Sequence, residues 1–367
     1  MKIAVISSHT PSLFWFRMDM MLEFIRRGST VIAIGNEPES KWAEEFRKSG
    51  IRYLSVPVQK NGTNPIKDLE TYRALKRVLA TERPDKVFTY QAKTVIYGGM
   101  AAHKLGIGAY PLIAGVGSVF LSSGIKASVV RMVLKTEYRV SMKHAEKVFF
   151  QNPDDVKVFT ENKIISADSV VMLNGSGVNL NRFKLVPLPE KPVFLCVSRL
   201  IRDKGVGEYL QAAKSVKECF PEVRFLLVGP YDTNPSALTP EELKPYIDDG
   251  VIEYFGEQMD VRPYLAECSI FVLPSYREGT PKAVLEAMAC GRAVLTTDAP
   301  GCRETVIDGE NGYLVPVKDV PALVRRMEEL IQDPGSVKKM GASGRKLVEE
   351  KFDVDKVNDT ICRAMGV

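Results

Sequence analysis

The sequence predicts an α/β protein with two doubly wound, parallel-sheet domains. Short runs of β-branched and aromatic residues alternate with helix-length amphipathic segments along the whole chain, a pattern typical of βαβ units. The alternation pauses at residues 174–192 (NGSGVNLNRFKLVPLPEKP), where Gly, Asn and Pro indicate a boundary and a linker. A chain of 367 residues is also long enough for two domains of common size.

The first domain is expected to span residues 1–183. Gly28 and Gly50 end its first two predicted helices, because glycine readily takes the left-handed conformation that follows a helix. The predicted strands are 2–7, 30–35, 53–58, 86–89, 111–115, 147–151 and 169–174, and the predicted helices are 14–27, 41–49, 68–82, 95–105 and 125–143.

The second domain is expected to span residues 191–353, and a last helix follows at about 354–367. The same alternation of strands and helices restarts after the linker, which predicts a second parallel sheet. Its predicted strands are 193–198, 224–228, 251–255, 270–274, 293–297 and 313–315.

The rest of the chain is organised around residues 270–291 (IFVLPSYREGTPKAVLEAMACG). The apolar start predicts a strand, and residues 275–279 predict a polar turn. Thr280 suits the N-cap of the following helix, Pro281 suits its first position, and Gly291 ends it. The N–H groups of such a first turn attract an anion.

Two carboxylates flank this predicted anion site. Glu278 lies in the turn ahead of the helix and Glu286 lies inside it, so each can accept hydrogen bonds from hydroxyl groups. A nucleotide-sugar offers the matching pattern, with a diphosphate between a ribose diol and the sugar hydroxyls. The alternative is an ordinary strand-turn-helix unit with solvated carboxylates.

A pair of cations opens the second domain. Arg199 and Lys204 bracket a tight loop that closes on Gly205. Arginine can bind phosphate as a fork and lysine as a point charge, so the pair can reach both phosphates of a diphosphate. Solvated loop charges are the alternative interpretation.

The motif S-Y-R-E-G-x-P-x-x-x-L-E-A-M-A-C-G and the pattern V-S-R-L…K-G resemble the donor site of retaining family-4 glycosyltransferases. The resemblance covers essentially the whole chain. It implies the GT-B fold, two Rossmann-like domains that face a central cleft, with the last helix crossing back onto the first domain. The implied catalytic residues are Arg199, Lys204 and Glu278, and the implied donor-binding residues are Gly279, Thr280, Pro281, Lys282, Glu286, Gly229, Gly256 and Gln258. Turn chemistry alone also explains Gly229 and Gly256.

On the acceptor side the resemblance implies His9, Arg17 and Lys93. His9 ends a strand, where a structural histidine is the alternative. Residues 90–93 (YQAK) stand where relatives show a T-H-T-P-K run, and only Lys93 matches it. Ala114 stands where many relatives carry a histidine near the reacting centre, so details of catalysis transfer less well than donor binding.

Within the family, the chain is most similar to enzymes that extend sugars on lipid diphosphates in capsule, O-antigen and N-glycan assembly. These include enzymes that transfer N-acetylgalactosamine to undecaprenyl-diphosphate-bacillosamine. The expected reaction moves an N-acetylhexosamine from a UDP-sugar to a polyprenyl-diphosphate-linked saccharide, without a metal. A sugar-nucleotide epimerase of the same fold and a non-catalytic binding protein are the alternatives.

Charge is distributed unevenly between the two halves. Residues 1–180 hold 25 Lys and Arg against 16 Asp and Glu, a net charge of +9, which favours an anionic partner. In the predicted helix 125–143, Arg131, Lys135, Arg139 and Lys143 form a basic stripe, and Ile125, Val129, Val133 and Val140 gather on another face behind Phe120 and Leu121. We expect this helix to meet an anionic membrane surface, a packing helix being the alternative.

The remaining composition is that of a globular protein without a membrane span. The N-terminus (MKIAVISSH) has no signal-peptide pattern. The six cysteines and three histidines show no metal-type spacing. We therefore expect a cytoplasmic protein, peripheral at the inner face of the cell membrane, with no metal and no nucleic-acid partner.

Overall fold

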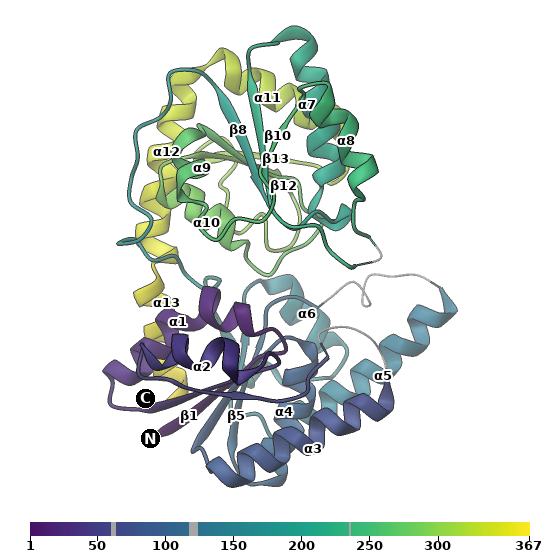
Figure 1. Ribbon diagram of the computed structural model, residues 1–367, viewed down its shortest axis with the longest axis vertical. Coiled ribbons are helices and arrows are strands. Elements are labelled where there is room, and N and C mark those ends of the chain that lie inside the picture. The colour runs from purple at the N-terminus through teal and green to yellow at the C-terminus, as the bar shows by residue number, and fades with distance from the viewer. Residues whose placement is uncertain (60–63, 117–123, 235) are drawn as a thin grey trace. The chain divides into compact units, whose positions relative to one another are not determined.

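The structure is a computed structural model that describes residues 1–59, 64–116, 124–234 and 236–367 (Figure 1). The chain divides into two compact units. The first comprises Met1–Ser176 with Val354–Val367, and the second comprises Gly177–Asp353. Each unit has its own parallel sheet with helices on both faces, which confirms the predicted fold class.

The sheet of the first unit has the order β3-β2-β1-β4-β5-β6-β7 among the described residues. The chain winds outward from β1 through β2 and β3, then returns to the centre at β4 and continues the other way. Its strands are β1 (Lys2–Ile6), β2 (Thr30–Gly35), β3 (Arg52–Ser55), β4 (Lys86–Tyr90), β5 (Gly108–Ile113), β6 (Val148–Phe150) and β7 (Val170–Met172). The central strands are almost continuously apolar because both faces of the sheet are covered.

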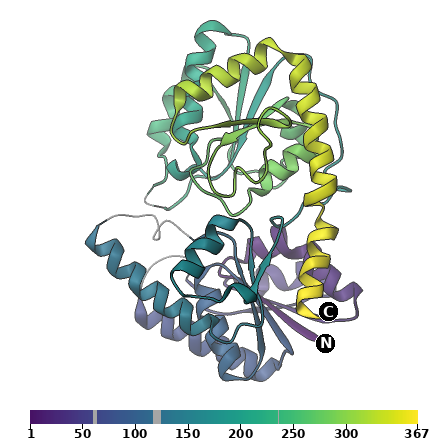
Figure 2. The ribbon, with the colours of Figure 1, turned by 180° about the vertical axis from the view of Figure 1, so that it is seen from behind.

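Helices cover the two faces of this sheet in different groups. On one face lie α3, α4, α5 and α6, and on the other lie α1, α2 and α13. Figure 2 shows α13 in yellow beside α1 in purple, although the two helices are at opposite ends of the chain. The bounds are α1 (Thr10–Arg26), α2 (Glu39–Arg47), α3 (Pro65–Glu82), α4 (Ala92–Lys104), α5 (Ile125–Met142), α6 (Pro153–Glu161) and α13 (Val354–Met365).

The sheet of the second unit has the order β10-β9-β8-β11-β12-β13 within the described ranges. Its strands are β8 (Val193–Val197), β9 (Arg224–Val228), β10 (Glu253–Tyr254), β11 (Ile270–Leu273), β12 (Ala293–Thr297) and β13 (Gly312–Val315). Its helices are η3 (Arg202–Lys204), α7 (Val206–Cys219), α8 (Pro240–Asp248), α9 (Arg262–Glu267), α10 (Lys282–Ala289), α11 (Val320–Gln332), α12 (Pro334–Leu347) and η4 (Val348–Phe352). The helices α7, α8 and α11 pack on one face, while α9 and α10 pack on the other.

The first unit ends at Ser176 and not at residue 183, where the sequence places the domain boundary. Val178 donates its backbone N–H to the carbonyl of Phe352 at 2.9 Å. Phe183 is buried in the core of the second unit. Residues 177–183 therefore fold with the second unit although their composition indicates a linker.

Residues 186 and 187, in the second half of the predicted linker, are attached to the second unit by Arg292. This side chain is fully buried, and it donates hydrogen bonds to the carbonyls of Val186 at 3.0 Å and Pro187 at 3.1 Å. It also donates to the carbonyls of Leu265 and Ala266. A buried guanidinium is tolerated here because backbone oxygens surround it.

Candidate functional site

The carboxyl edge of the second sheet brings the predicted donor residues together. β8 and β11 are neighbours at the centre of the sheet, where the direction of winding reverses. Loops at such a reversal diverge and leave a crevice that binds ligands in doubly wound folds. The loop after β8 carries Arg199 and Lys204, and the loop after β11 carries Glu278.

The two loops are fastened to each other by backbone contacts. Tyr276 donates its N–H to the carbonyl of Asp203 at 2.9 Å, and Ser275 Oγ donates to the same oxygen at 3.1 Å. Gly205 has φ +71°, and a Cβ atom there would stand 2.0 Å from the carbonyl oxygen of Pro274. Glycine is therefore required at 205 for this close approach.

Lys204 and Glu278 form an ion pair at the meeting point of these loops. Lys204 Nζ lies 2.5 Å from Glu278 Oε1, and both side chains are largely buried. The ammonium group of Lys204 can bind a phosphate, and the carboxylate of Glu278 can accept hydrogen bonds from sugar hydroxyls. The structure thus brings together two residues that the sequence places 74 positions apart.

Arg199 has a partner that the sequence analysis missed. Its Nη1 atom lies 2.7 Å from Asp232 Oδ2, on the loop after β9, and the Arg199 side chain is 44% exposed. Asp232 lies in a polar loop, residues 231–234, whose local sequence does not indicate that it pairs with Arg199. Asp232 thus occupies the guanidinium fork of Arg199, and binding of a diphosphate by Arg199 stays a prediction.

The helix α10 begins one residue later than predicted. Pro281 is its N-cap, with φ −72° and ψ 109°, and the first helical residue is Lys282. The prediction of Thr280 as N-cap and Pro281 as first helical residue is wrong, because the extended ψ of Pro281 keeps it outside the helix. Gly291 follows the helix with φ +79°, which confirms the predicted end.

Glu286, inside α10, is a carboxylate with a strongly raised pKa. Burial raises the pKa of Glu286 to about 7, although Lys282 and Arg182 lower it in part and Asp260 raises it further. Arg182 and Asp260 were not predicted as site residues, because they lie in a segment expected to be linker and in an ordinary loop. A carboxyl group with this pKa changes charge near neutral pH.

Gly229 joins the loops at the ends of β8, β9 and β10. Its φ is +147°, and a Cβ atom would stand 1.8 Å from the carbonyl oxygen of Ser198. Its N–H donates to the carbonyl of Gly256 at 2.8 Å. Gln258 is exposed and donates its side-chain amide to the carbonyl of Phe255 at 2.7 Å. Gly229 is therefore needed for packing, and its role toward a nucleotide stays a prediction.

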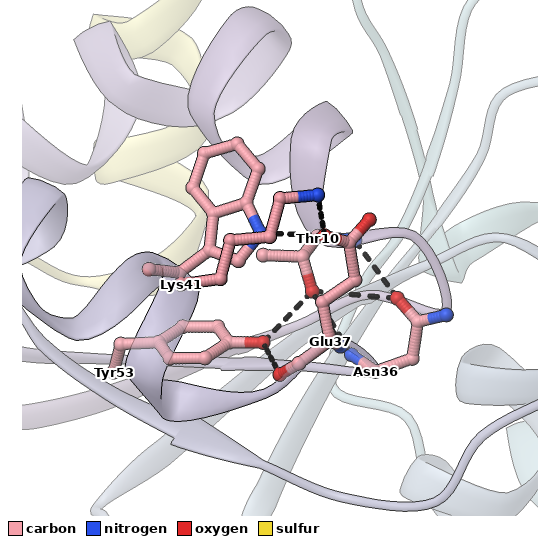
Figure 3. A network of polar contacts seen from close by, with 6 residues as sticks. Thr10, Asn36, Glu37, Lys41 and Tyr53 are labelled. Carbon is pink, nitrogen blue, oxygen red and sulfur yellow. Dashed lines mark hydrogen bonds and ion pairs between the residues drawn. The ribbon is translucent and has the colours of Figure 1, made fainter.

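In the first unit, the start of α1 is fixed to the end of β2 (Figure 3). Thr10 Oγ1 accepts the N–H groups of Asn36 at 3.0 Å and Glu37 at 3.1 Å, and it shares a hydrogen bond with Tyr53. Burial raises the pKa of Glu37, but hydrogen bonds from Lys41 and the Trp42 indole outweigh burial and leave it below its ordinary value, with a smaller contribution from His9. His9 thus interacts electrostatically with the carboxylate of Glu37.

Lys93 and Arg17, the other predicted acceptor residues, are both mostly buried. Lys93 forms an ion pair with Asp68 and thereby joins α4 to α3. Arg17 lies between α1 and the sheet, with its guanidinium over the Tyr90 ring. Lys93 thus has a structural partner in the first unit, and its contact with an acceptor stays a prediction.

Within the described ranges, no three His, Cys, Asp or Glu side chains are grouped so that they could hold a metal ion together. Independence of metals stays a prediction.

Comparisons with known proteins define the class of this protein. Residues 191–333 match the family described as glycosyl transferases group 1. Anabaena HepE in complex with UDP has the same fold, with a TM-score of 0.78 at 18% identity over the full length of both chains. The chain is therefore a glycosyltransferase of the GT-B fold, and its second unit contains a group 1 glycosyltransferase domain.

Two curated relatives cover most of the chain. One is N,N'-diacetylbacillosaminyl-diphospho-undecaprenol alpha-1,3-N-acetylgalactosaminyltransferase of Campylobacter jejuni subsp. jejuni serotype O:2, 29% identical over 91% of this chain and 90% of that protein. The other is UDP-Gal:alpha-D-GlcNAc-diphosphoundecaprenol alpha-1,3-galactosyltransferase of Escherichia coli, 24% identical over 80% of this chain and 79% of that protein. These relatives confirm the resemblance and decide against an epimerase.

Proposed function

We propose that the protein transfers an N-acetylhexosamine from a UDP-sugar to a saccharide linked to a polyprenyl diphosphate, with retention of anomeric configuration. The names of both relatives specify acceptors on diphosphoundecaprenol. The observation that carries the proposal is the Lys204–Glu278 ion pair at the winding reversal of the matched domain. This arrangement supports a donor site with a phosphate on one side and sugar hydroxyls on the other.

Each residue of the donor site has a proposed role. Lys204 and Arg199 stabilise the charge that builds on the leaving phosphate, since fixed cations act on charge that develops in the transition state. Glu278 and the backbone at the start of α10 hold the transferred sugar. Glu286 accepts hydrogen bonds from the ribose diol. No protein nucleophile is needed if the leaving phosphate draws the proton from the acceptor hydroxyl.

The test is nucleotide release from a panel of UDP- and GDP-sugars, with and without a lipid-diphosphate saccharide. We expect UDP release that depends on the acceptor. Lys204→Ala should abolish most of it, whereas Lys214→Ala, which removes an exposed charge from α7, should not. Absence of release from every nucleotide-sugar would contradict the proposal.

We further propose that α5 holds the protein at an anionic membrane surface. Val129, Met132, Val133 and Val140 are each more than half exposed along this helix. Arg131 and Lys135 line a shallow groove with Met132, so cationic and apolar side chains share the exposed surface. Such a helix binds lipid through its apolar face and its charges. Phe120 and Leu121 lie outside the described residues, and nothing is described of the Ile125 side chain.

Arg139, one residue of the basic stripe, also stabilises the end of α6. Arg139 donates hydrogen bonds to the carbonyls of Asn162 at 2.7 Å and Lys163 at 3.3 Å, and it thereby satisfies the end of α6. The charge-reversal variant should therefore leave Arg139 intact and change Arg131 and Lys135 to Glu. No described helix is long and apolar enough to cross a bilayer. The proposed place of action is the inner face of the cell membrane.

Liposome co-sedimentation tests this docking. Each basic residue near an anionic surface adds about 1 kcal/mol, so the double reversal should release the protein from vesicles that contain phosphatidylglycerol. A matched control reverses Lys76 and Arg77 of α3. Equal binding by the α5 variant and the wild type, or binding without anionic lipid, would contradict this role of α5.

A further inference from the structure

Arg17 is a buried cation at the winding reversal of the first sheet. It lies on the inner face of α1 and is 3% exposed. Its guanidinium carbon stands 4.9 Å from the centre of the Tyr90 ring and 6.0 Å from the centre of the Phe88 ring. In the described part of the chain, its Nε atom is fully buried without a hydrogen-bond partner, and no carboxylate pairs with the guanidinium.

The fold does not neutralise this charge. Burial lowers the pKa of Arg17 to about 10, and nearby Tyr90 raises it in part, so the side chain stays protonated at neutral pH. Burying a cation without a partner costs hydration free energy. Contact with the face of an aromatic ring compensates only a fraction of that cost. An arginine in this position is therefore better explained by a ligand than by packing.

Gln91 directly follows Tyr90, the last residue of β4, and joins two loops near Arg17. Gln91 has φ +73° and ψ 141°, a conformation that costs energy for any residue except glycine. Its Oε1 atom accepts hydrogen bonds from Ser7 Oγ at 2.8 Å, Ser8 N at 2.9 Å and Ser8 Oγ at 2.8 Å. The strained residue thus ties the loop after β1 to the loop after β4.

Tyr90 belongs to the same network. Its hydroxyl shares a hydrogen bond of 2.8 Å with Ser12 Oγ, and Ser12 Oγ also accepts from Gln91 Nε2 at 3.3 Å. The ring that lies against the guanidinium is therefore fixed from its far end. β1 and β4 are the central neighbours of the sheet, so this network stands at the crevice where doubly wound sheets bind ligands.

We propose that Arg17 binds the diphosphate of the lipid-linked acceptor. The planar fork of arginine matches a phosphate, with which it forms paired, charge-assisted hydrogen bonds. An N-acetylhexosamine is uncharged, and the donor diphosphate has Arg199 and Lys204 in the second unit. The acceptor diphosphate is then the anionic group of the two substrates that a cation in the first unit can bind. This inference rests on the proposed function and deepens it.

Stability separates a ligand role from a structural one. Arg17→Leu removes an unpaired buried cation and should keep or raise the Tm, because apolar replacements of buried charges are often neutral or stabilising. Arg26→Leu is the matched control, since it removes the same charge from an exposed position on the same helix. A marked fall in Tm for Arg17→Leu with unchanged acceptor kinetics would overturn the proposal.

Binding is tested with inorganic pyrophosphate in the presence of saturating UDP, which occupies the donor site. Pyrophosphate should raise the Tm of the wild type and of Arg26→Leu but not of Arg17→Leu, and UDP alone should raise all three equally. An equal pyrophosphate effect on Arg17→Leu would overturn the proposal. Failure of UDP to stabilise even the wild type would instead count against the proposed function.

Steady-state kinetics provide the third test of the proposal. Arg17→Leu should raise the KM for the lipid-diphosphate acceptor by about 10- to 100-fold, the range for loss of a charged hydrogen bond, while the KM for the UDP-sugar stays constant. Arg17→Lys keeps the charge without the planar guanidinium, so its KM for the acceptor should lie between those of the wild type and Arg17→Leu. If Arg17→Leu does not fold, Arg17→Met takes its place, and a wild-type acceptor KM in that variant would overturn the proposal.

Discussion

Glu286 should make UDP binding depend on pH near neutrality. Burial raises the pKa of Glu286 to about 7 in the free protein. The ionised carboxylate can accept hydrogen bonds from both ribose hydroxyls, whereas the protonated carboxyl group is a weaker acceptor. The carboxyl group is about nine-tenths ionised at pH 8 and about nine-tenths protonated at pH 6. If UDP binds the ionised form, its Kd should be about tenfold higher at pH 6 than at pH 8.

Isothermal titration calorimetry of UDP over this range is the assay. UDP carries a phosphate that itself loses a proton near pH 6, so Glu286→Gln is the reference that retains the titration of the ligand and lacks that of the protein. The difference between the two proteins isolates Glu286. A parallel pH dependence in the wild type and Glu286→Gln would refute the proposed ribose role.

Glu286 should also make the stability of the unliganded protein depend on pH, in the opposite direction to its effect on UDP binding. Its folded-state pKa lies above the ordinary value of 4.5, so the neutral form favours folding. This stabilisation is present below pH 4.5 and is lost as the pH rises toward 7, by up to about 3 kcal/mol. Glu286→Gln should remove this slope in urea denaturation, and an unchanged slope would assign it to other groups.

Three further predictions follow from the second unit. Lys204→Ala should lower kcat/KM by about 10²- to 10³-fold in a UDP-release assay, and a loss below tenfold would refute its place beside the leaving phosphate. Transfer should persist in EDTA, whereas loss of activity that Mg²⁺ or Mn²⁺ restores would show a metal requirement. Arg292→Met should destabilise the protein by about 3–5 kcal/mol in urea denaturation, because the carbonyls around Arg292 lose a buried donor; a loss below about 1 kcal/mol would contradict that account.

Most of the fold follows from local patterns in the sequence. Alternating β-rich and amphipathic runs predict the strands and helices, since burial on both faces of a parallel sheet requires apolar strands. Element ends are less well determined. α1 begins at Thr10 and not at 14, and α4 begins at Ala92 and not at 95, because residues in a first helical turn need not follow the apolar repeat.

The sequence by itself determined the fold class, the loops that carry the donor residues and the likeness to glycosyltransferases, because each depends on residues that are close together in the chain. Only the tertiary structure decided the partners: Glu278 for Lys204, Asp232 for Arg199 and Asp68 for Lys93. It also left Arg17 buried over an aromatic ring. These pairings depend on strand order and on how loops pack at the edge of each sheet, which local periodicity does not encode.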